Sequence, residues 1–332
     1  MKLLFNKEND GARQLQQLTG NYYANNNFAK IQMDIRLETE EIIKLIGLPV
    51  YQLAEDFYYE KEPEASGSGS GGLPSEDYSE LVEHIQIAVA YKATFNFYQA
   101  NIISHEDNGR KVKIDNENEK MPWEWMFDRD DQANQAKAYR MTDRLIEFLD
   151  QKNYDAWKES EFQINSRKLL VNRAVLFDQY FPIDKSGRFY YVLQPFISQV
   201  QKQIIEPAMG IEKFEELFQY WQKQDPVKPE LEVTLLLAQE ALVLKTMERA
   251  VPRLSIKVLP DGVVQQFKSM MQSRNASQAA LDETLKRFVA GIKKIADEAL
   301  DELKKHITPE ETDIEDLDLL PKNDCNSKIF RT

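Results

Sequence analysis

The feature that most constrains the fold of this 332-residue chain is an internal repeat. Residues 42–59 read IIKLIGLPVYQLAEDFYY, and residues 204–221 read IIEPAMGIEKFEELFQYW. When Gly47 is set on Gly210, an offset of 163 positions, apolar residues fall on apolar residues. Repetition of this kind predicts a repeated structural unit. Chance similarity between two helical segments is the alternative interpretation.

A second pair of segments repeats with a smaller offset. Residues 81–109 align with residues 234–262 at an offset of 153 positions, so the first half should carry about ten extra residues before this block. Residues 60–77 supply them in a stretch rich in Ser, Gly and Glu, which is typical of a flexible loop. The stretch lacks the Lys-Ser/Thr pair of a phosphate-binding loop.

The two halves also begin alike, with LLFN at residues 3–6 and LLVN at residues 169–172. We therefore expect a first helical unit over residues 1–160 and a second over residues 161–308, each of ordinary domain size. An acidic C-terminal arm would cover residues 309–332.

Apolar spacing predicts a mainly α fold. Helices are expected over residues 39–59, with a break at Gly47-Leu48-Pro49, and over residues 81–98, 130–150, 231–250 and 277–306. The helix at 231–250 is so apolar that it should be buried on more than one side. The last helix carries apolar residues at helical spacing, namely Leu281, Leu285, Phe288, Val289, Ile292 and Ile295.

A small β-hairpin is expected after the long helix of each unit. Residues 102–114 and 254–267 contain alternating patterns around Asn108-Gly109 and Asp261-Gly262, and such dipeptides favour tight hairpin turns. The predicted fold class is thus mainly α, with two related helical units, a small β-hairpin in each, and extended terminal arms.

Composition excludes several classes of function. The net charge of −13 opposes free binding of DNA, and seven carboxylates lie in residues 310–324 alone. One cysteine, Cys325, and three scattered histidines, His84, His105 and His306, give little for a metal, so we expect neither metal nor cofactor. The sequence shows no membrane span or signal peptide, and we expect synthesis in a host cytoplasm.

The strongest candidate for catalysis is PWEWMFDRDDQ at residues 122–132. An enzyme could be built around Trp123 and Trp125 with the acids Glu124 and Asp128. A helix N-terminus, with acids in its first turn and aromatic residues anchoring it to the core, explains the segment as well. No acid–base pair or nucleophile is fixed by spacing, so we expect no enzyme.

Both termini carry apolar residues that suit arms docking on a neighbouring protein. A disordered end is the alternative for the C-terminus. The predicted partner-binding residues are Leu3, Leu4, Phe5, Lys328, Ile329, Phe330 and Arg331.

TEEIIKLIG at residues 39–47, followed by LVEHIQIAVAYKATFNFYQAN from residue 81, resembles the two core helices of head-to-tail connector (adaptor) proteins of tailed bacteriophages. The resemblance covers residues 28–157 and again 191–305, as in a duplicated connector. The LPDGV segment at residues 259–263 is also similar to uncharacterised phage or prophage proteins of gut Bacteroidetes.

The resemblance implies a non-enzymatic ring of twelve copies at the virion neck. This ring would sit on the portal protein and extend the DNA channel towards tail or neck proteins. DNA would be passing cargo only, and no membrane would be involved. Family members are generally shorter than this chain, and a fused duplication would change how the subunits match a twelve-fold portal. The alternatives are another ring protein of the neck and a cytoplasmic helical module that binds a protein partner.

Overall fold

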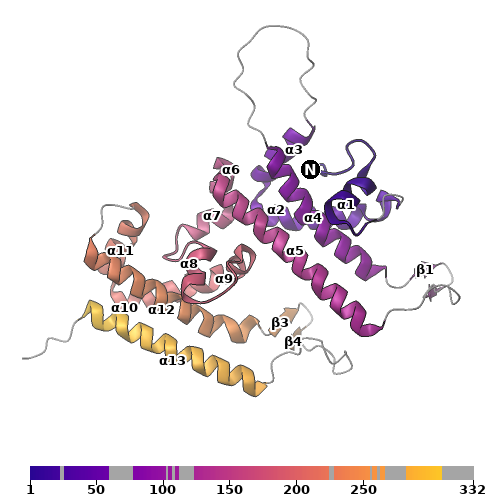
Figure 1. Ribbon diagram of the computed structural model, residues 1–332. Coiled ribbons are helices and arrows are strands. Elements are labelled where there is room, and N and C mark those ends of the chain that lie inside the picture. The colour runs from indigo at the N-terminus through magenta and orange to yellow at the C-terminus, as the bar shows by residue number, and fades with distance from the viewer. Residues whose placement is uncertain are drawn as a thin grey trace, which may run out of the picture.

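The computed structural model describes most of the chain, in segments separated by gaps (Figure 1). The described residues are 1–22, 26–59, 78–101, 104–106, 109–111, 123–223, 228–254, 256–259, 262–265 and 282–308. They form a mainly helical fold, which confirms the predicted class. None of the described helices is long and apolar enough to cross a membrane.

The first unit is built around one long helix. Its elements are, in order, α1 (Gly11–Thr19), η1 (Phe28–Lys30), α2 (Gln32–Ile46), α3 (Leu48–Tyr59), α4 (Ser79–Ala100), β1 (Ser104–Glu106), β2 (Gly109–Lys111) and α5 (Glu124–Lys152). Helix α4 contacts α1, α2, α3 and α5 and is therefore the centre of the unit. Two short helices, α6 (Asp155–Lys158) and α7 (Glu161–Ser166), lead to the second unit.

The second unit repeats this order. Its elements are α8 (Ala174–Tyr180), α9 (Gly187–Val200), the π-helical turn η2 (Gln201–Ile205), α10 (Glu206–Met209), α11 (Ile211–Lys223), α12 (Pro229–Leu254), β3 (Ile256–Leu259), β4 (Gly262–Gln265) and α13 (Asp282–Ile307). Helix α12 contacts α8, α9, α11 and α13, as α4 contacts its own four neighbours. Every residue from 241 to 247 is buried, so the prediction that this helix is buried on more than one side is confirmed.

Gly47 and Gly210 show the equivalence of the two units in backbone geometry. Gly47 has φ 91° and ψ 146°, and Gly210 has φ 80° and ψ 145°. Each glycine N–H donates to the carbonyl four residues earlier, at 2.8 Å to Ile43 and 3.0 Å to Glu206, and a new helix begins at the next residue. The predicted break at Gly47 is confirmed, and its partner in the repeat is a break of the same shape.

Replacing either glycine by alanine should cost a similar amount of stability. A positive φ combined with an extended ψ is adopted almost only by glycine, and another residue there is strained by about 1–3 kcal/mol. Urea unfolding of Gly47→Ala and Gly210→Ala should show a loss in this range for each variant. Gly291→Ala is the control, because a Cβ there meets nothing within 4 Å and alanine favours the interior of α13. If Gly47→Ala and Gly210→Ala both behaved like Gly291→Ala, the predicted strain would be wrong, and a loss of stability in only one of the two would contradict the equivalence of the units.

A buried glutamine marks the same position in both central helices. Gln86 Nε2 donates to the carbonyl of Leu4 at 2.5 Å, and Gln239 Nε2 donates to the carbonyl of Leu170 at 2.9 Å. Gln86 aligns with Gln239 in the repeat, and Leu4 aligns with Leu170. Each opening apolar segment is thus fixed to its central helix by the same hydrogen bond, since a buried carbonyl requires a donor.

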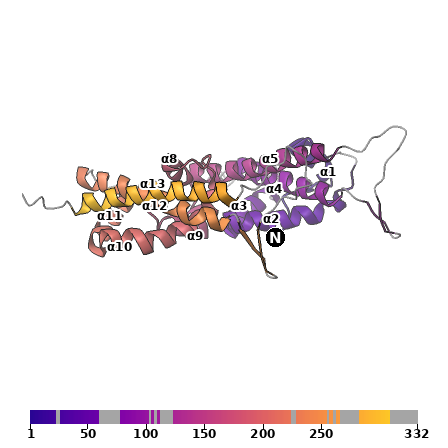
Figure 2. The ribbon, with the colours of Figure 1, turned by 90° about the horizontal axis from the view of Figure 1, so that it is seen from below.

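The two units share one continuous hydrophobic core, and the molecule is elongated with the units end to end (Figure 2). At the junction α9 begins against α5, where a Cβ on Gly187 would lie 2.7 Å from Ile146 Cγ2. Asp143 Oδ1 accepts hydrogen bonds at 2.9 Å from Ser186 Oγ and from the N–H of Arg188. The start of the second unit is therefore fixed directly to the last helix of the first.

Short antiparallel strand pairs follow both central helices. In β1–β2, Ser104 faces Lys111 and Glu106 faces Gly109, and in β3–β4 Ile256 faces Gln265 and Leu259 faces Gly262. The residues between the paired strands lie outside the described part of the chain.

Candidate interaction surfaces

The described residues contain no group of three or more His, Cys, Asp or Glu side chains that could hold a metal ion. The ring of His84 stacks on Phe148 at a centroid distance of 4.4 Å, and burial lowers the pKa of this histidine. His306 Nε2 lies 3.0 Å from Thr234 Oγ1, where α13 meets α12. His105 belongs to β1. His84 and His306 thus make contacts that belong to the packing of the helices.

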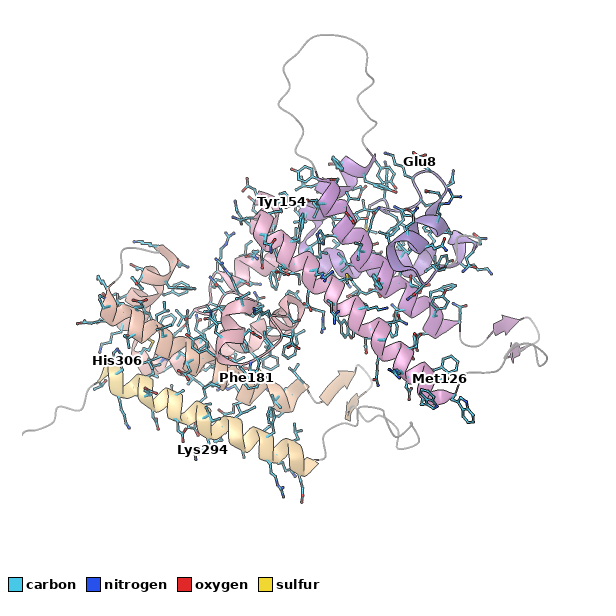
Figure 3. All side chains as sticks on the ribbon, in the orientation of Figure 1. Glu8, Met126, Tyr154, Phe181, Lys294 and His306 are labelled. Carbon is cyan, nitrogen blue, oxygen red and sulfur yellow. The ribbon has the colours of Figure 1, made fainter. Side chains whose placement is uncertain are left out.

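The aromatic segment at the start of α5 lies at the surface. Trp123 is the N-cap residue and is 71% exposed, and Trp125 and Met126 are each 41% exposed. Figure 3 shows Met126 near the end of α5 that points away from the rest of the molecule. The prediction of a helix N-terminus is confirmed, but the prediction that its tryptophans anchor it to the core is wrong. The aromatic group is thus exposed at the surface rather than packed in the core.

The N-terminal arm needs a correction. Leu4 is 1% exposed and Phe5 4% exposed, both within the chain's own core, and Leu3 packs against that core. Tyr51 Oη donates to the Lys2 carbonyl at 2.7 Å, and Tyr59 Oη donates to the Leu3 carbonyl at 2.6 Å. The side chains of Leu3, Leu4 and Phe5 pack within the first unit, and the carbonyls of Lys2 and Leu3 accept hydrogen bonds there. This segment is therefore not free to dock on a neighbour.

The four predicted C-terminal arm residues, Lys328, Ile329, Phe330 and Arg331, lie outside the described residues. The described chain ends just after α13, where the carbonyl of Ile307 accepts a hydrogen bond from Lys213 Nζ at 2.9 Å. The end of α13 is therefore fixed beside α11.

Helix α2 presents an exposed stripe on the first unit, here called the α2 face, made of Met33, Arg36, Leu37, Glu40 and Glu41. Met33 is 61% exposed and Leu37 49%. Beside it lies a hollow of about 300 Å³ lined by Met1, Leu3, Ala29, Gln32, Met33 and Arg36.

Helix α13 presents an exposed surface on the second unit, here called the α13 face. In it Phe288 and Ile295 lie on one side of the helix, and Lys286, Arg287 and Lys294 lie further around it. Phe288 is 51% exposed and Ile295 53%, although their spacing is that of the buried residues of the same helix. Residues 286–295 contain four cations and no acid. Lys294 lies on the outer side of α13, away from α12 (Figure 3).

A third feature is an open groove of about 1140 Å³ where the two units meet, here called the junction groove. One wall is α5, and the other is formed by residues 172–189 with Trp221 of α11. Its charged lining residues are the cations Arg140, Arg144, Arg173, Lys185 and Arg188 and the acids Asp143, Glu147, Asp150 and Asp184. Spacing in the sequence does not predict this groove, because its walls come from three separate segments of the chain.

Two of the acids that line the groove, Asp143 and Asp150, already accept hydrogen bonds from other residues of the chain. Asp143 accepts the two hydrogen bonds at the unit junction, and Asp150 Oδ1 accepts from Trp157 Nε1 at 2.9 Å and Gln163 Nε2 at 2.8 Å. Burial raises the pKa of Asp150, and these hydrogen bonds and the nearby Arg173 oppose that rise. The guanidinium of Arg188 lies 3.9 Å from the centre of the Tyr139 ring, and its buried Nε has no hydrogen-bond partner.

These features define a mainly helical protein made of two related units with exposed apolar and charged faces. The chain belongs to the Family of unknown function (DUF6712), whose model matches residues 42–167 and 205–325. The two matched segments begin at Ile42 and Ile205, which the repeat aligns and which are both buried. The organisation in two related units is thereby confirmed. No curated protein and no solved structure matches the chain.

Proposed function

We propose that this protein is a structural virion protein, a head-to-tail connector that forms a ring on the phage portal and extends the DNA channel towards the tail. The observation that supports it is the presence of two different exposed apolar faces, the α2 face on the first unit and the α13 face on the second. A ring of identical subunits with head-to-tail contacts needs two such surfaces, whereas a two-fold dimer uses one surface twice.

The two faces suit each other in shape. The α13 face offers Phe288 as a projecting aromatic side chain, and the α2 face lies beside the hollow lined by Met1 and Met33. An aromatic anchor in an apolar hollow is the arrangement that carries most of the energy in many interfaces.

The two faces also suit each other in charge. Around Leu37, the charges of helix α2 that are not buried are the acids Asp34, Glu40 and Glu41 and the cations Arg36 and Lys44, and Lys44 pairs with Glu41 at 2.6 Å. The α13 face carries the cations Lys286, Arg287 and Lys294, of which Arg287 lies 4.0 Å from Glu283 and Lys294 lies 3.9 Å from Glu298. Opposite charges steer such surfaces together and fix their register. The ring contact we propose is therefore the α13 face of one copy on the α2 face of the next.

Two single variants test this contact. Leu37→Glu should disable the α2 face, and Phe288→Glu should disable the α13 face, since burying a charge in a hot spot costs about 2 kcal/mol or more, roughly a thirtyfold loss of affinity. Each variant alone should be a monomer by native mass spectrometry. An equimolar mixture should give one-to-one dimers and nothing larger, because each dimer joins one intact α2 face to one intact α13 face.

The control variant is Ile211→Glu, at a site that is 72% exposed on neither face. It should assemble like the unmodified protein. A mixture of the two single variants that remained monomeric would contradict the contact, as would a Phe288→Glu variant that still assembled.

The remaining parts of the proposal concern the partners. The portal and the tail or neck proteins would contact the ends of the ring, and DNA would pass through its channel. The net charge of −13 supports passage without binding, because like charge weakens contacts with phosphate. The protein would then reside at the portal vertex of the virion, and its C-terminal arm, Lys328 to Arg331, would contact a neighbour.

A second candidate function is a helical module that binds a protein partner, and the exposed Trp123, Trp125 and Met126 support it. Tryptophan is enriched among the residues that dominate binding energy. Such a module would be monomeric or dimeric at every concentration. A pull-down that returned host proteins from infected cells, and lost them with Trp125→Ala, would favour the module over the connector.

A further inference from the structure

The junction groove offers arginines that have no carboxylate partner among the described residues. Arg140 and Arg144 lie one turn apart on α5 and both are exposed, and neither has a carboxylate within 4.0 Å in the described chain. Arg173 faces them from the second unit, near Asp150. Guanidinium groups on both walls of one groove favour a bound anion, since arginine binds carboxylates in a bidentate fashion.

The groove also has apolar lining. Val175 is 52% exposed in its wall, and Leu176, Phe189 and Trp221 line it too. A matching ligand would therefore be an extended peptide in which carboxylates alternate with aliphatic side chains, because a purely anionic ligand would leave this apolar surface uncovered.

The chain itself carries such a peptide beyond α13. Residues 313–320 read DIEDLDLL, with four carboxylates alternating with aliphatic residues. Their charge and their apolar content both match the groove.

This peptide begins close to the groove. The carbonyl of Ile307 is bonded to Lys213 on α11, and Trp221 of the groove lies on the same helix eight residues further along, about 12 Å at 1.5 Å per residue. The 24 residues that follow Thr308 can span far more than this, at up to about 3.3 Å per residue. Intramolecular binding also benefits from the high effective concentration of a tethered ligand.

We propose that the junction groove binds the acidic segment, residues 310–324, of its own chain, with the carboxylates on Arg140, Arg144 and Arg173 and the aliphatic side chains against Val175 and Trp221. The segment then bridges the two units, because Arg140 and Arg144 belong to the first and Arg173 and Trp221 to the second. This binding is within one copy and does not depend on ring formation.

The single cysteine of the chain provides the test. Cys325 directly follows the acidic segment, so Val175→Cys places a second thiol in the groove of the full-length protein. Under mild oxidation with diamide, an intramolecular disulfide should form on the order of ten times faster than in Met33→Cys, whose thiol would lie on the α2 face. Electrophoresis without reductant separates the crosslinked monomer from crosslinked dimers.

A second set of variants tests whether binding of the acidic segment depends on the arginines of the groove. Adding Arg140→Gln, Arg144→Gln and Arg173→Gln to Val175→Cys should slow the disulfide to the rate of the Met33→Cys control, and 1 M salt should slow it in the same direction. These arginines are exposed, so the triple variant should keep its helical circular dichroism signal. Equal rates in the groove and control variants would overturn the proposal. Disulfides found only between copies would also overturn it and would assign the groove to a neighbour's tail.

Discussion

Replacing Trp157 by alanine should destabilise the protein by about 3–5 kcal/mol, the cost of deleting a large buried aromatic side chain. Trp157 is 1% exposed, lies in α6 between the two units, and stacks on Phe162 at a centroid distance of 5.5 Å. Its Nε1 donates to Asp150, so the variant also removes a donor from a carboxylate in the junction groove. The free energy of unfolding, from urea titration followed by circular dichroism, measures the loss.

The matched control is Ile164→Ala in α7, because Ile164 is close in sequence and 43% exposed. Its effect should stay within about 0.5 kcal/mol. Because both units share one core, Trp157→Ala should lower a single unfolding transition. A variant that separated two transitions, with one unit unaffected, would contradict the shared core.

Removing both carboxylates that face Lys245 should destabilise the protein by about 2–3 kcal/mol. Lys245 is buried in α12 with 8% of its side chain exposed, and its ammonium bonds Glu248 at 2.8 Å and Asp297 of α13. In Glu248→Gln with Asp297→Asn, the buried charge loses its partners, which is costly for a buried pair. Breaking a fully buried ion pair costs about 3–5 kcal/mol. We expect a smaller loss of stability here because the side chain of Asp297 is 50% exposed.

The pH dependence of stability should change in the same variant. The hydrogen bond from Lys245 holds the pKa of Asp297 below its usual value. A carboxyl with a lowered folded-state pKa stabilises the fold above its unfolded pKa, about 3.9, and this contribution is lost as the pH falls through the folded pKa. The unmodified protein should therefore lose more stability between pH 5 and acid than the double variant.

Burial alone would lower the pKa of Lys245, but its two carboxylate partners outweigh burial and leave this pKa above the usual value. The control for the charge change is Asp301→Asn, since Asp301 and Lys304 form an exposed pair at 3.6 Å. Such pairs contribute about 0–1 kcal/mol. A double variant no less stable than this control would contradict the role of Lys245 in joining α12 to α13.

Local signals in the sequence were enough to predict the repeat and the long helices α4, α5, α12 and α13, but they did not predict α1, α8 or α9. The break at Gly47 follows from a residue that tolerates positive φ, and the burial of α12 follows from an apolar run that no single helix face can hold. The pairing of Gly47 with Gly210 needed only the alignment of the chain with itself.

Other features depend on tertiary packing and could not be read from spacing. Phe288 and Ile295 have the periodicity of a buried stripe, yet α12 covers only part of α13 and leaves them exposed. Leu4 and Phe5 read as a free arm, yet Gln86, 82 residues further along, holds this segment in the core. The junction groove arises only when α5 meets residues 172–189 and α11.

The measurement that tests the central claim most directly is native mass spectrometry of the unmodified full-length protein over a concentration series. The ring account predicts one closed oligomer of fixed copy number, near twelve, with few intermediates, because head-to-tail contacts between the α13 and α2 faces are all satisfied only when the ring closes. A stable monomer or dimer at every concentration would contradict it.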